Sequence, residues 1–269
     1  MPAKVCALCE GTGWKPVEVD GVRRMVRCDC REAEHAEHLI AQARIPRRYE
    51  QCAFENFDIR KDIVTGRANP SLVAAKLNAE RFVEEYPTDF GLLFIGPTGV
   101  GKTHLAVAIL RELILQKSVE CLFCDFRDLL KEIQDSYNPV SQSSEWRILQ
   151  RLLDIEVLLL DELSGANPSD WVKETLSHLI NSRYNQKKVT LITTTLPFGE
   201  TPSRRGSRAA GREEVRMPSG ETVPDVDRSL GQLGVTLRSR LYEMCKLVEI
   251  NSDDFRKAVK QAGYKFHVE

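Results

Sequence analysis

Hydrophobic positions in most of this chain alternate between short continuous apolar runs and longer stretches with helical spacing. The apolar runs predict strands at 90–95, 119–124, 156–160, 188–194 and, more briefly, 246–250. The amphipathic stretches predict helices at 70–86, 102–116, 126–136, near 144–153, 169–186 and 253–262. This alternation predicts an α/β fold in which a parallel sheet carries helices on both faces.

The N-terminal quarter does not follow this alternation. Residues 31–43 are rich in Glu, Ala and His and predict a helix, and 44–66 predict an irregular linker with aromatic anchors. We therefore expect an N-terminal segment at 1–30, a helix and linker at 31–66, and the main domain at 67–269. Residues 199–228, rich in Arg, Gly, Ser and Pro, predict a flexible insertion, which is either a basic arm for DNA or a partner, or a solvated spacer.

Composition narrows the classes of function. The chain has 269 residues and a formal net charge of −1, so any contact with DNA must come from a local patch or from an oligomer that concentrates one. No apolar run approaches the roughly 18 residues of a membrane span, and the N-terminus lacks the apolar core of a signal peptide. We expect a cytoplasmic protein without membrane partners, whose eight cysteines are reduced.

A complete phosphate-binding motif, G-x-x-x-x-G-K-T, lies between the first predicted strand of the sheet and the helix after it. The glycines allow the backbone N–H groups to surround phosphates, the lysine adds a cation, the threonine hydroxyl binds Mg²⁺, and the helix N-terminus adds its positive dipole end. The residues of this motif are Gly96, Pro97, Thr98, Gly99, Val100, Gly101, Lys102 and Thr103.

A second nucleotide signal follows the strand at 156–160. That strand ends in Asp161 and Glu162. In ATPases of this plan the first carboxylate holds the Mg²⁺ shell and the second activates the attacking water, so the pair predicts hydrolysis. The chain has no Asn-Lys-x-Asp motif for reading guanine, which favours ATP over GTP.

Two weaker signals lie toward the C-terminus. The strand at 188–194 runs into three threonines, and Thr195 would reach between the two nucleotide motifs, although threonine also suits strands for its β-propensity alone. Arg238 and Arg240 flank an apolar helical stretch. Such an arginine either stabilises charge on a neighbouring subunit's γ-phosphate or forms a surface salt bridge.

Four of the cysteines form two close pairs near the N-terminus, Cys6-x-x-Cys9 and Cys28-x-Cys30. Four thiolates in this spacing suit a tetrahedral Zn²⁺ site, and a segment this short would need a metal in order to fold. The alternative is four ordinary thiols. Cys121 and Cys124 lie on an apolar strand, which favours packing over ligation.

With these motifs in hand, the chain resembles the DnaC/IstB-type branch of the AAA+ ATPases over about residues 44–262. The resemblance rests on the phosphate loop, the Asp-Glu strand end, Ile45–Tyr49, the Thr-Thr-x-Leu strand end and the stretch Ser239–Cys245. It implies a compact AAA+ module in a replicative helicase loader or a transposition helper ATPase.

The resemblance also implies roles for single residues. Arg240 would be an arginine finger acting in trans with Arg238 beside it, and Arg256 would face the nucleotide. Thr195 falls at the sensor position, where the family usually has Asn, so hydrolysis is expected to be slow or differently gated. The cysteine segment resembles the N-terminal zinc domain of DnaI-like loaders, which docks on the helicase.

Three hypotheses follow from the resemblance. The first is a loader that binds ATP and Mg²⁺, assembles as a homo-oligomer, engages DNA, expected to be single-stranded, and delivers a DnaB-type helicase. The second is an IstB-like helper that assembles on duplex DNA and recruits a transposase. The third is a nucleotide-gated adaptor with little turnover.

Overall fold

The computed structural model describes residues 6–19, 21–60, 66–138, 144–163, 169–195 and 235–257. The predicted insertion at 199–228 and the C-terminal part of the predicted last helix lie outside these residues. Within the described part of the chain, no helix combines the length and the apolar character that crossing a membrane requires.

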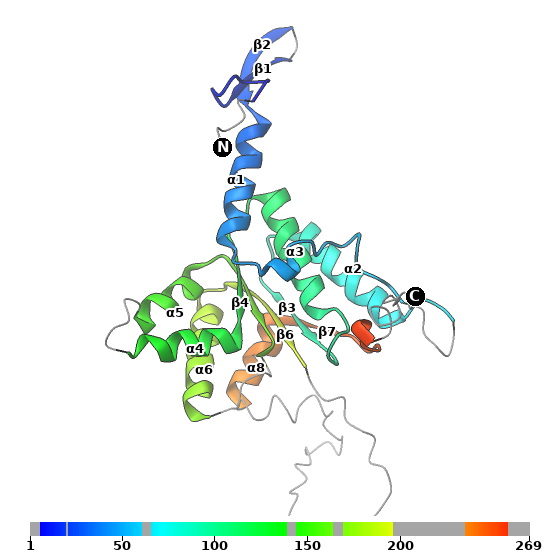
Figure 1. Cartoon of the computed structure of the whole chain (residues 1–269), viewed down its shortest axis with the longest axis vertical. Coiled ribbons are helices and arrows are strands. Elements are labelled where there is room, and N and C mark those ends of the chain that lie inside the picture. Colours follow the sequence, from blue (N-terminus) through cyan, green and yellow to red (C-terminus); the bar gives the residue numbers. More distant parts are fainter. Residues whose placement is uncertain are drawn as a thin grey trace, which may run out of the picture.

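Five parallel strands form the central sheet (Figure 1). They are β3 (Gly91–Ile95), β4 (Cys121–Asp125), β5 (Val157–Asp161), β6 (Val189–Thr194) and β7 (Cys245–Glu249). Their spatial order is β4-β5-β6-β3-β7, so β6 lies between the strand that precedes the phosphate motif and the strand that ends in Asp161. β3, β5 and β6 are buried along their whole length, as expected for strands covered on both faces.

Helices cover both faces of the sheet, which confirms the predicted α/β class. α2 (Pro70–Glu85) and α3 (Lys102–Lys117) pack on one face, while α4 (Phe126–Ser136), α5 (Glu145–Asp154), α6 (Asp170–Asn185) and α8 (Val235–Met244) pack on the other. Side chains of β3 alternate between the two cores. Leu92 and Phe94 contact the α2–α3 side, and Leu93 and Ile95 contact the opposite side.

The N-terminal part extends from this body on a single helix. α1 (Asp29–Gln42) carries at its far end the antiparallel hairpin of β1 (Trp14–Val19) and β2 (Val22–Arg27), well away from the sheet (Figure 1). The sequence analysis missed this hairpin. Asp20-Gly21 between alternating valines is a strong hairpin signal and would have located it.

The structure corrects several other predictions. α1 begins at Asp29 rather than residue 31, so Cys30 lies in its first turn. The apolar helical stretch beside Arg238 and Arg240 is α8, for which the sequence analysis gave no bounds, and the short 3₁₀ helix Arg47–Tyr49 was not predicted. At the C-terminal end, helical backbone begins at Phe255 rather than residue 253.

Part of the stretch 44–66, which was predicted to be a linker, packs against the main domain. Its Phe54 and Phe57 are buried in the core on the α2–α3 side. The Phe57 ring meets the His104 ring of α3 edge-on, with 5.5 Å between ring centroids, and a ring nitrogen of His104 hydrogen-bonds to the Ala53 carbonyl oxygen at 2.9 Å. These contacts fix the segment against the start of α3, next to the phosphate motif.

A fully buried arginine holds together the opposite end of the sheet. Arg183 of α6 has no exposed surface, and burial lowers the pKa of its guanidinium to about 9. The guanidinium donates five hydrogen bonds, to the Thr190 hydroxyl and to the carbonyl oxygens of Leu152, Ile155, Glu156 and Val189. Because α5, the two residues just before β5, and the start of β6 all contribute acceptors, this one side chain fixes where β5 and β6 begin.

Candidate nucleotide site and cysteine cluster

The phosphate loop forms where β3 ends and α3 begins. Gly99 and Gly101 adopt φ values of +79° and +104°, a region that other residues rarely occupy. A Cβ atom on Gly101 would also lie 2.6 Å from the Phe57 ring. The backbone thus turns sharply into α3, whose first N–H groups have no partner within the helix and are available to a phosphate.

Asp161, at the end of β5, is held from two sides. Its Oδ1 accepts a hydrogen bond from the Thr103 hydroxyl at 2.8 Å and another from the Thr193 hydroxyl at 2.6 Å. Burial raises the pKa of this carboxyl group, and the two hydroxyl groups act against that shift. The phosphate loop, β5 and β6 therefore meet at one carboxylate oxygen.

Glu162 is fixed by the threonines of β6. Its backbone N–H donates to the Thr193 hydroxyl oxygen at 2.9 Å, and the Thr195 hydroxyl donates to its Oε2 at 3.0 Å. Its φ of +54° is unusual for a residue other than glycine. The turn that directly follows β5 is therefore anchored through both backbone and side chain.

Lys102 lies between these groups. Its Nζ donates to the carbonyl oxygens of Gly96 and Pro97, both at 2.8 Å, and to the Thr195 hydroxyl oxygen at 3.3 Å. Burial lowers the pKa of this ammonium group, while Glu162 and Asp161 raise it in part. The structure thus brings together Lys102, Thr103, Asp161, Glu162 and Thr195, which the sequence analysis had selected from three separate motifs.

Lys102, Thr103, Asp161 and Glu162 line a cleft of about 540 Å³. The stretch 44–66 and the C-terminal segment complete its walls with Tyr49, Phe57, Arg60, Phe255 and Arg256. Arg256 was predicted to face the nucleotide, and the structure places it in this lining. The cleft combines backbone donors, a cation, two carboxylates and aromatic side chains, a set of groups suited to a nucleoside triphosphate with a divalent ion.

The other predicted arginines lie elsewhere. Arg240 donates to the side-chain oxygen of Asn181 and lies over the Tyr184 ring, 5.6 Å from its centroid, so it packs on α6 and is not part of the cleft lining. Arg238 belongs to α8, and its side chain is outside what the structure describes. The structure therefore does not bring the predicted finger to the nucleotide cleft of its own chain.

The four N-terminal cysteines converge as their spacing predicted. Their sulfur atoms all lie within 4.8 Å of one another, with 3.8 Å between Cys6 and Cys28 and 3.4 Å between Cys9 and Cys30. A tetrahedron with Zn–S bonds of about 2.3 Å has edges of about 3.8 Å. A backbone hydrogen bond from Gly13 lowers the pKa of Cys9 to about 7, whereas contact with the neighbouring Cys9 thiol raises the pKa of Cys30. The group could hold a metal ion. Cys121, by contrast, is buried in the core, as predicted.

Sequence reasoning missed one residue at the centre of the nucleotide site. Thr193 is fully buried, and its hydroxyl group both accepts from the Glu162 N–H and donates to Asp161. The run of three threonines was noticed, but only Thr195 was chosen from it. Side-chain alternation would have placed Thr193 and Thr195 on the same face of β6.

Comparison with known proteins agrees with this geometry. The sequence model of the IstB-like ATP-binding protein family matches residues 26–207, which is more than half of the chain. The chain belongs to the IstB-like ATP-binding protein family. The family match and the fold together confirm the prediction that this chain is an AAA+ ATPase with a phosphate-binding loop.

Relatives of this IstB-like protein include replication proteins. It is 29% identical to the replicative helicase loader DnaC of Escherichia coli K12, over 61% of this chain and 63% of that protein. It is 24% identical to the uncharacterized protein YqaM of Bacillus subtilis, over 90% of this chain and 66% of that protein. The chain thus spans about two thirds of the length of these relatives.

A solved structure shows that the similarity to DnaC holds for the fold as well as for the sequence. The crystal structure of the DnaC helicase loader superposes with a TM-score of 0.58 at 29% identity and covers 76% of this chain and 99% of that one. The fold of the IstB-like protein is therefore shared with a helicase loader over nearly the whole of the solved loader.

Thr193→Val should slow ATP hydrolysis, because Asp161 loses a donor and the Glu162 N–H loses its acceptor. Loss of a residue that orients metal-binding groups typically costs roughly 10–100-fold in activity or metal affinity. We expect a decrease of that order in turnover, and a rise in the Mg²⁺ concentration needed for half-maximal activity, in a steady-state ATPase assay.

Two variants control for this experiment. Thr193→Ser keeps the hydroxyl group and should recover most of the activity. Thr194→Val makes the same change at the next buried threonine of β6, whose side chain points to the opposite face of the sheet, and should leave the Mg²⁺ dependence unchanged. If Thr193→Val and Thr194→Val have the same Mg²⁺ dependence, Thr193 does not position the carboxylates.

Proposed function

We propose that this protein is an ATP-dependent loader of a DnaB-type replicative helicase. In this proposal it binds ATP, assembles with copies of itself, engages single-stranded DNA and releases the helicase when ATP is hydrolysed. The observation that carries the proposal is the likeness to DnaC, which holds in sequence and in fold.

The cleft supplies groups for each part of the hydrolysis. Thr103 and Asp161 would hold Mg²⁺, which neutralises charge on the phosphate oxygens. The side chain of Lys102 already points among backbone oxygens of the phosphate loop, and it would exchange those partners for the β- and γ-phosphates. Glu162 would take the proton of the attacking water, and Thr195 would act as the sensor that aligns Glu162 with the γ-phosphate.

Arg240 would complete the site of a neighbouring copy. Its contacts with Asn181 and Tyr184 hold the half-buried guanidinium against α6, from where it would reach the nucleotide of another subunit. A cation delivered to the γ-phosphate stabilises charge in the transition state. Hydrolysis would therefore depend on assembly, with Arg238 beside the finger and Arg256 on the nucleotide within the same chain.

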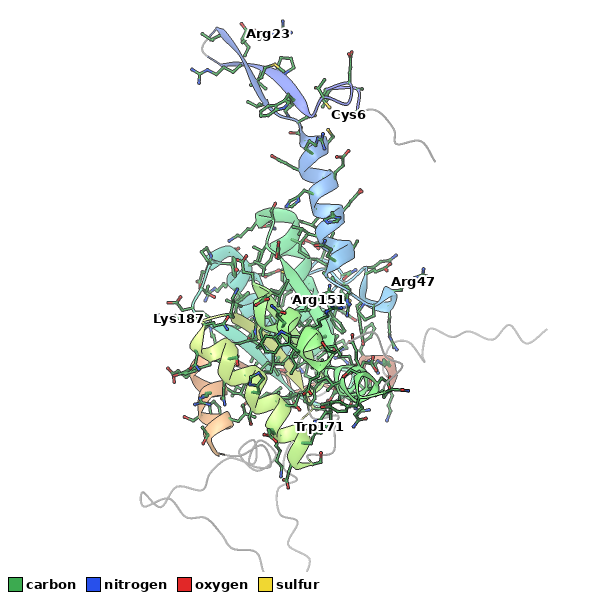
Figure 2. All side chains as sticks on the ribbon, turned by 90° about the vertical axis from the view of Figure 1, so that its left-hand side faces the viewer. Cys6, Arg23, Arg47, Arg151, Trp171 and Lys187 are labelled. Carbon is green, nitrogen blue, oxygen red and sulfur yellow. The ribbon has the colours of Figure 1, made fainter. Side chains whose placement is uncertain are left out.

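The cysteine cluster would determine the partner. Cys6, Cys9, Cys28 and Cys30 have the chemistry and spacing for Zn²⁺, which would stabilise the fold of this small segment. Its position at the end of α1, far from the nucleotide cleft, suits docking rather than catalysis (Figure 2). We propose that it docks on the helicase.

The alternative is an IstB-like transposition helper that assembles on duplex DNA. The family match favours it, because the family is named for such proteins. The two proposals differ in the partner. Capture of purified DnaB-type helicase in the presence of ATP supports the loader, whereas failure of that capture together with ATP-dependent assembly on duplex DNA supports the helper.

Loss of the metal should abolish helicase capture without unfolding the AAA+ core. We expect about one Zn²⁺ per chain by elemental analysis, because the described residues bring together one group of four cysteines. Cys6→Ser should lose this metal and make the N-terminal segment sensitive to protease, while ATP binding persists. Helicase capture should fall to background.

The matched control is Cys124→Ser, which changes a half-buried cysteine outside the cluster and should retain both the metal and helicase capture. If the Cys6→Ser protein captures the helicase as well as the unmodified protein does, the cysteine segment is not the docking element.

Mixing two inactive variants tests the shared active site. Arg240→Ala keeps an intact cleft but lacks the finger, and Lys102→Ala keeps the finger but lacks the phosphate-binding cation. Each alone should have little ATPase activity, and a mixture should regain part of it, because a mixed assembly contains some complete sites. If both variants still assemble and their mixture remains inactive, Arg240 does not act in trans.

A further inference from the structure

Three arginines gather around a second hollow, outside the nucleotide cleft. Arg44 follows α1, and Arg147 and Arg151 belong to α5. Together they line a cavity of about 200 Å³, which we call the arginine hollow. Its apolar floor includes residues of β4 and the helices behind it, Leu122, Phe123, Cys124, Leu129, Ile148 and Leu152.

Two hydrogen bonds to backbone carbonyl oxygens hold the residues around the arginine hollow in place. The Phe123 N–H donates to the Ala43 carbonyl oxygen at 2.8 Å, which joins the end of α1 to β4. Arg151 Nη2 donates to the Gln42 carbonyl oxygen at 3.1 Å, which joins α5 to the same point. Figure 2 looks onto this side of the molecule, with Arg151 near the lower end of α1. The arginine hollow therefore lies where hydrogen bonds join the end of α1 to β4 and to α5.

Positive charge in the hollow exceeds negative charge. Among the described residues of its lining, Glu132 is the one acidic side chain, and its Oε2 lies 4.0 Å from Arg44 Nη1. Burial lowers the pKa of Arg151, and the neighbouring charge of Arg44 lowers it further. Three guanidinium groups around one carboxylate leave a site that an anion would stabilise, and arginine binds phosphate oxygens in a bidentate manner.

The hollow lies at the surface, with Arg44, Arg147 and Arg151 all exposed, and its position suits a chain of phosphates. β4 is the end strand of the sheet, so the hollow lies at the margin of the body, where a longer ligand can continue past it. Arg147 and Arg151 are one helical turn apart, which corresponds to about 6 Å along the helix axis. That separation is comparable to the distance between neighbouring phosphates of an extended strand. With a formal net charge of −1 for the chain, a local cluster of this kind is what nucleic-acid binding requires.

We propose that the arginine hollow binds the phosphate backbone of single-stranded DNA. The inference rests on the proposed loader function and assigns its DNA contact to Arg44, Arg147 and Arg151. Glu132 sets the position of Arg44, and the apolar floor keeps the hollow open without competing for phosphate.

Binding of labelled oligothymidine to the full chain with ATP, followed by fluorescence anisotropy over a range of salt concentrations, tests the proposal. For Arg147→Glu/Arg151→Glu we expect affinity to fall at least about tenfold and the salt slope to shrink by roughly 1.4, or about 0.7 for each lost phosphate contact. Arg147→Lys keeps the charge but loses the bidentate geometry, so it should lose less affinity than the double variant and leave the salt slope nearly unchanged. Arg81→Glu reverses an exposed charge on α2 and should have little effect.

The outcomes separate this proposal from the loader function. If the unmodified protein binds oligothymidine and the double variant binds it equally well, or no worse than Arg81→Glu does, the arginine hollow is not the DNA site. A loss confined to duplex DNA also overturns the assignment. ATP binding of the double variant should match that of the unmodified protein, which excludes misfolding of the AAA+ core as the cause. If the unmodified protein binds no single-stranded DNA, the DNA step of the loader proposal fails as well.

Discussion

One oxygen atom of Asp161 joins the three elements on which the nucleotide site depends. Thr103 reaches it from the first turn of α3, and Thr193 reaches it from β6. Because the carboxyl group is buried, its charge is tolerable only with such donors. The Thr193 hydroxyl group also accepts a hydrogen bond from the Glu162 backbone N–H, so the same group positions both acidic residues. The strand order makes this arrangement possible, since β6 lies between β3 and β5 and brings its threonines to both motifs.

The two ends of the sheet have different roles: one stabilises the fold and the other forms the nucleotide site. At the end where β5 and β6 begin, Arg183 satisfies carbonyl oxygens from several segments and fixes the geometry. At the other end, β5 terminates in carboxylates that line the cleft, and the threonines at the end of β6 hold these carboxylates in place. Rigidity at one end thus supports accurate placement at the other. α1 extends away from this body and carries the cysteine cluster, so in the account proposed here partner recognition and nucleotide chemistry occupy separate parts of the chain (Figure 1).

Much of this organisation could be predicted from the sequence, because apolar strands and phosphate-loop glycines leave strong local signals. The alternation predicted all five strands of the sheet, and the sequence also predicted that Thr195 would reach between the two nucleotide motifs. The failures have physical causes. The role of Thr193 depends on which strand lies beside which, and that pairing is not local information. The sequence of 44–66 looks irregular because it lacks the periodicity of a helix or a strand. Nevertheless, Phe57 and Ala53 contact His104 and hold their part of this stretch against α3. The arginine hollow combines Arg44, which follows α1, with residues of α5 that are about one hundred positions further along the chain, so no motif could reveal it.

The central claim is that the side chains around Asp161 and Glu162 form an ATP-hydrolysing site, and Glu162→Gln tests it most directly. Glutamine has nearly the same shape and can still accept the hydrogen bond from Thr195, but it cannot take a proton from water. ATP binding, measured by calorimetry, should stay close to that of the unmodified protein, while the single-turnover rate of hydrolysis should fall by about 100-fold or more. Hydrolysis by Glu162→Gln at the unmodified rate would contradict this account.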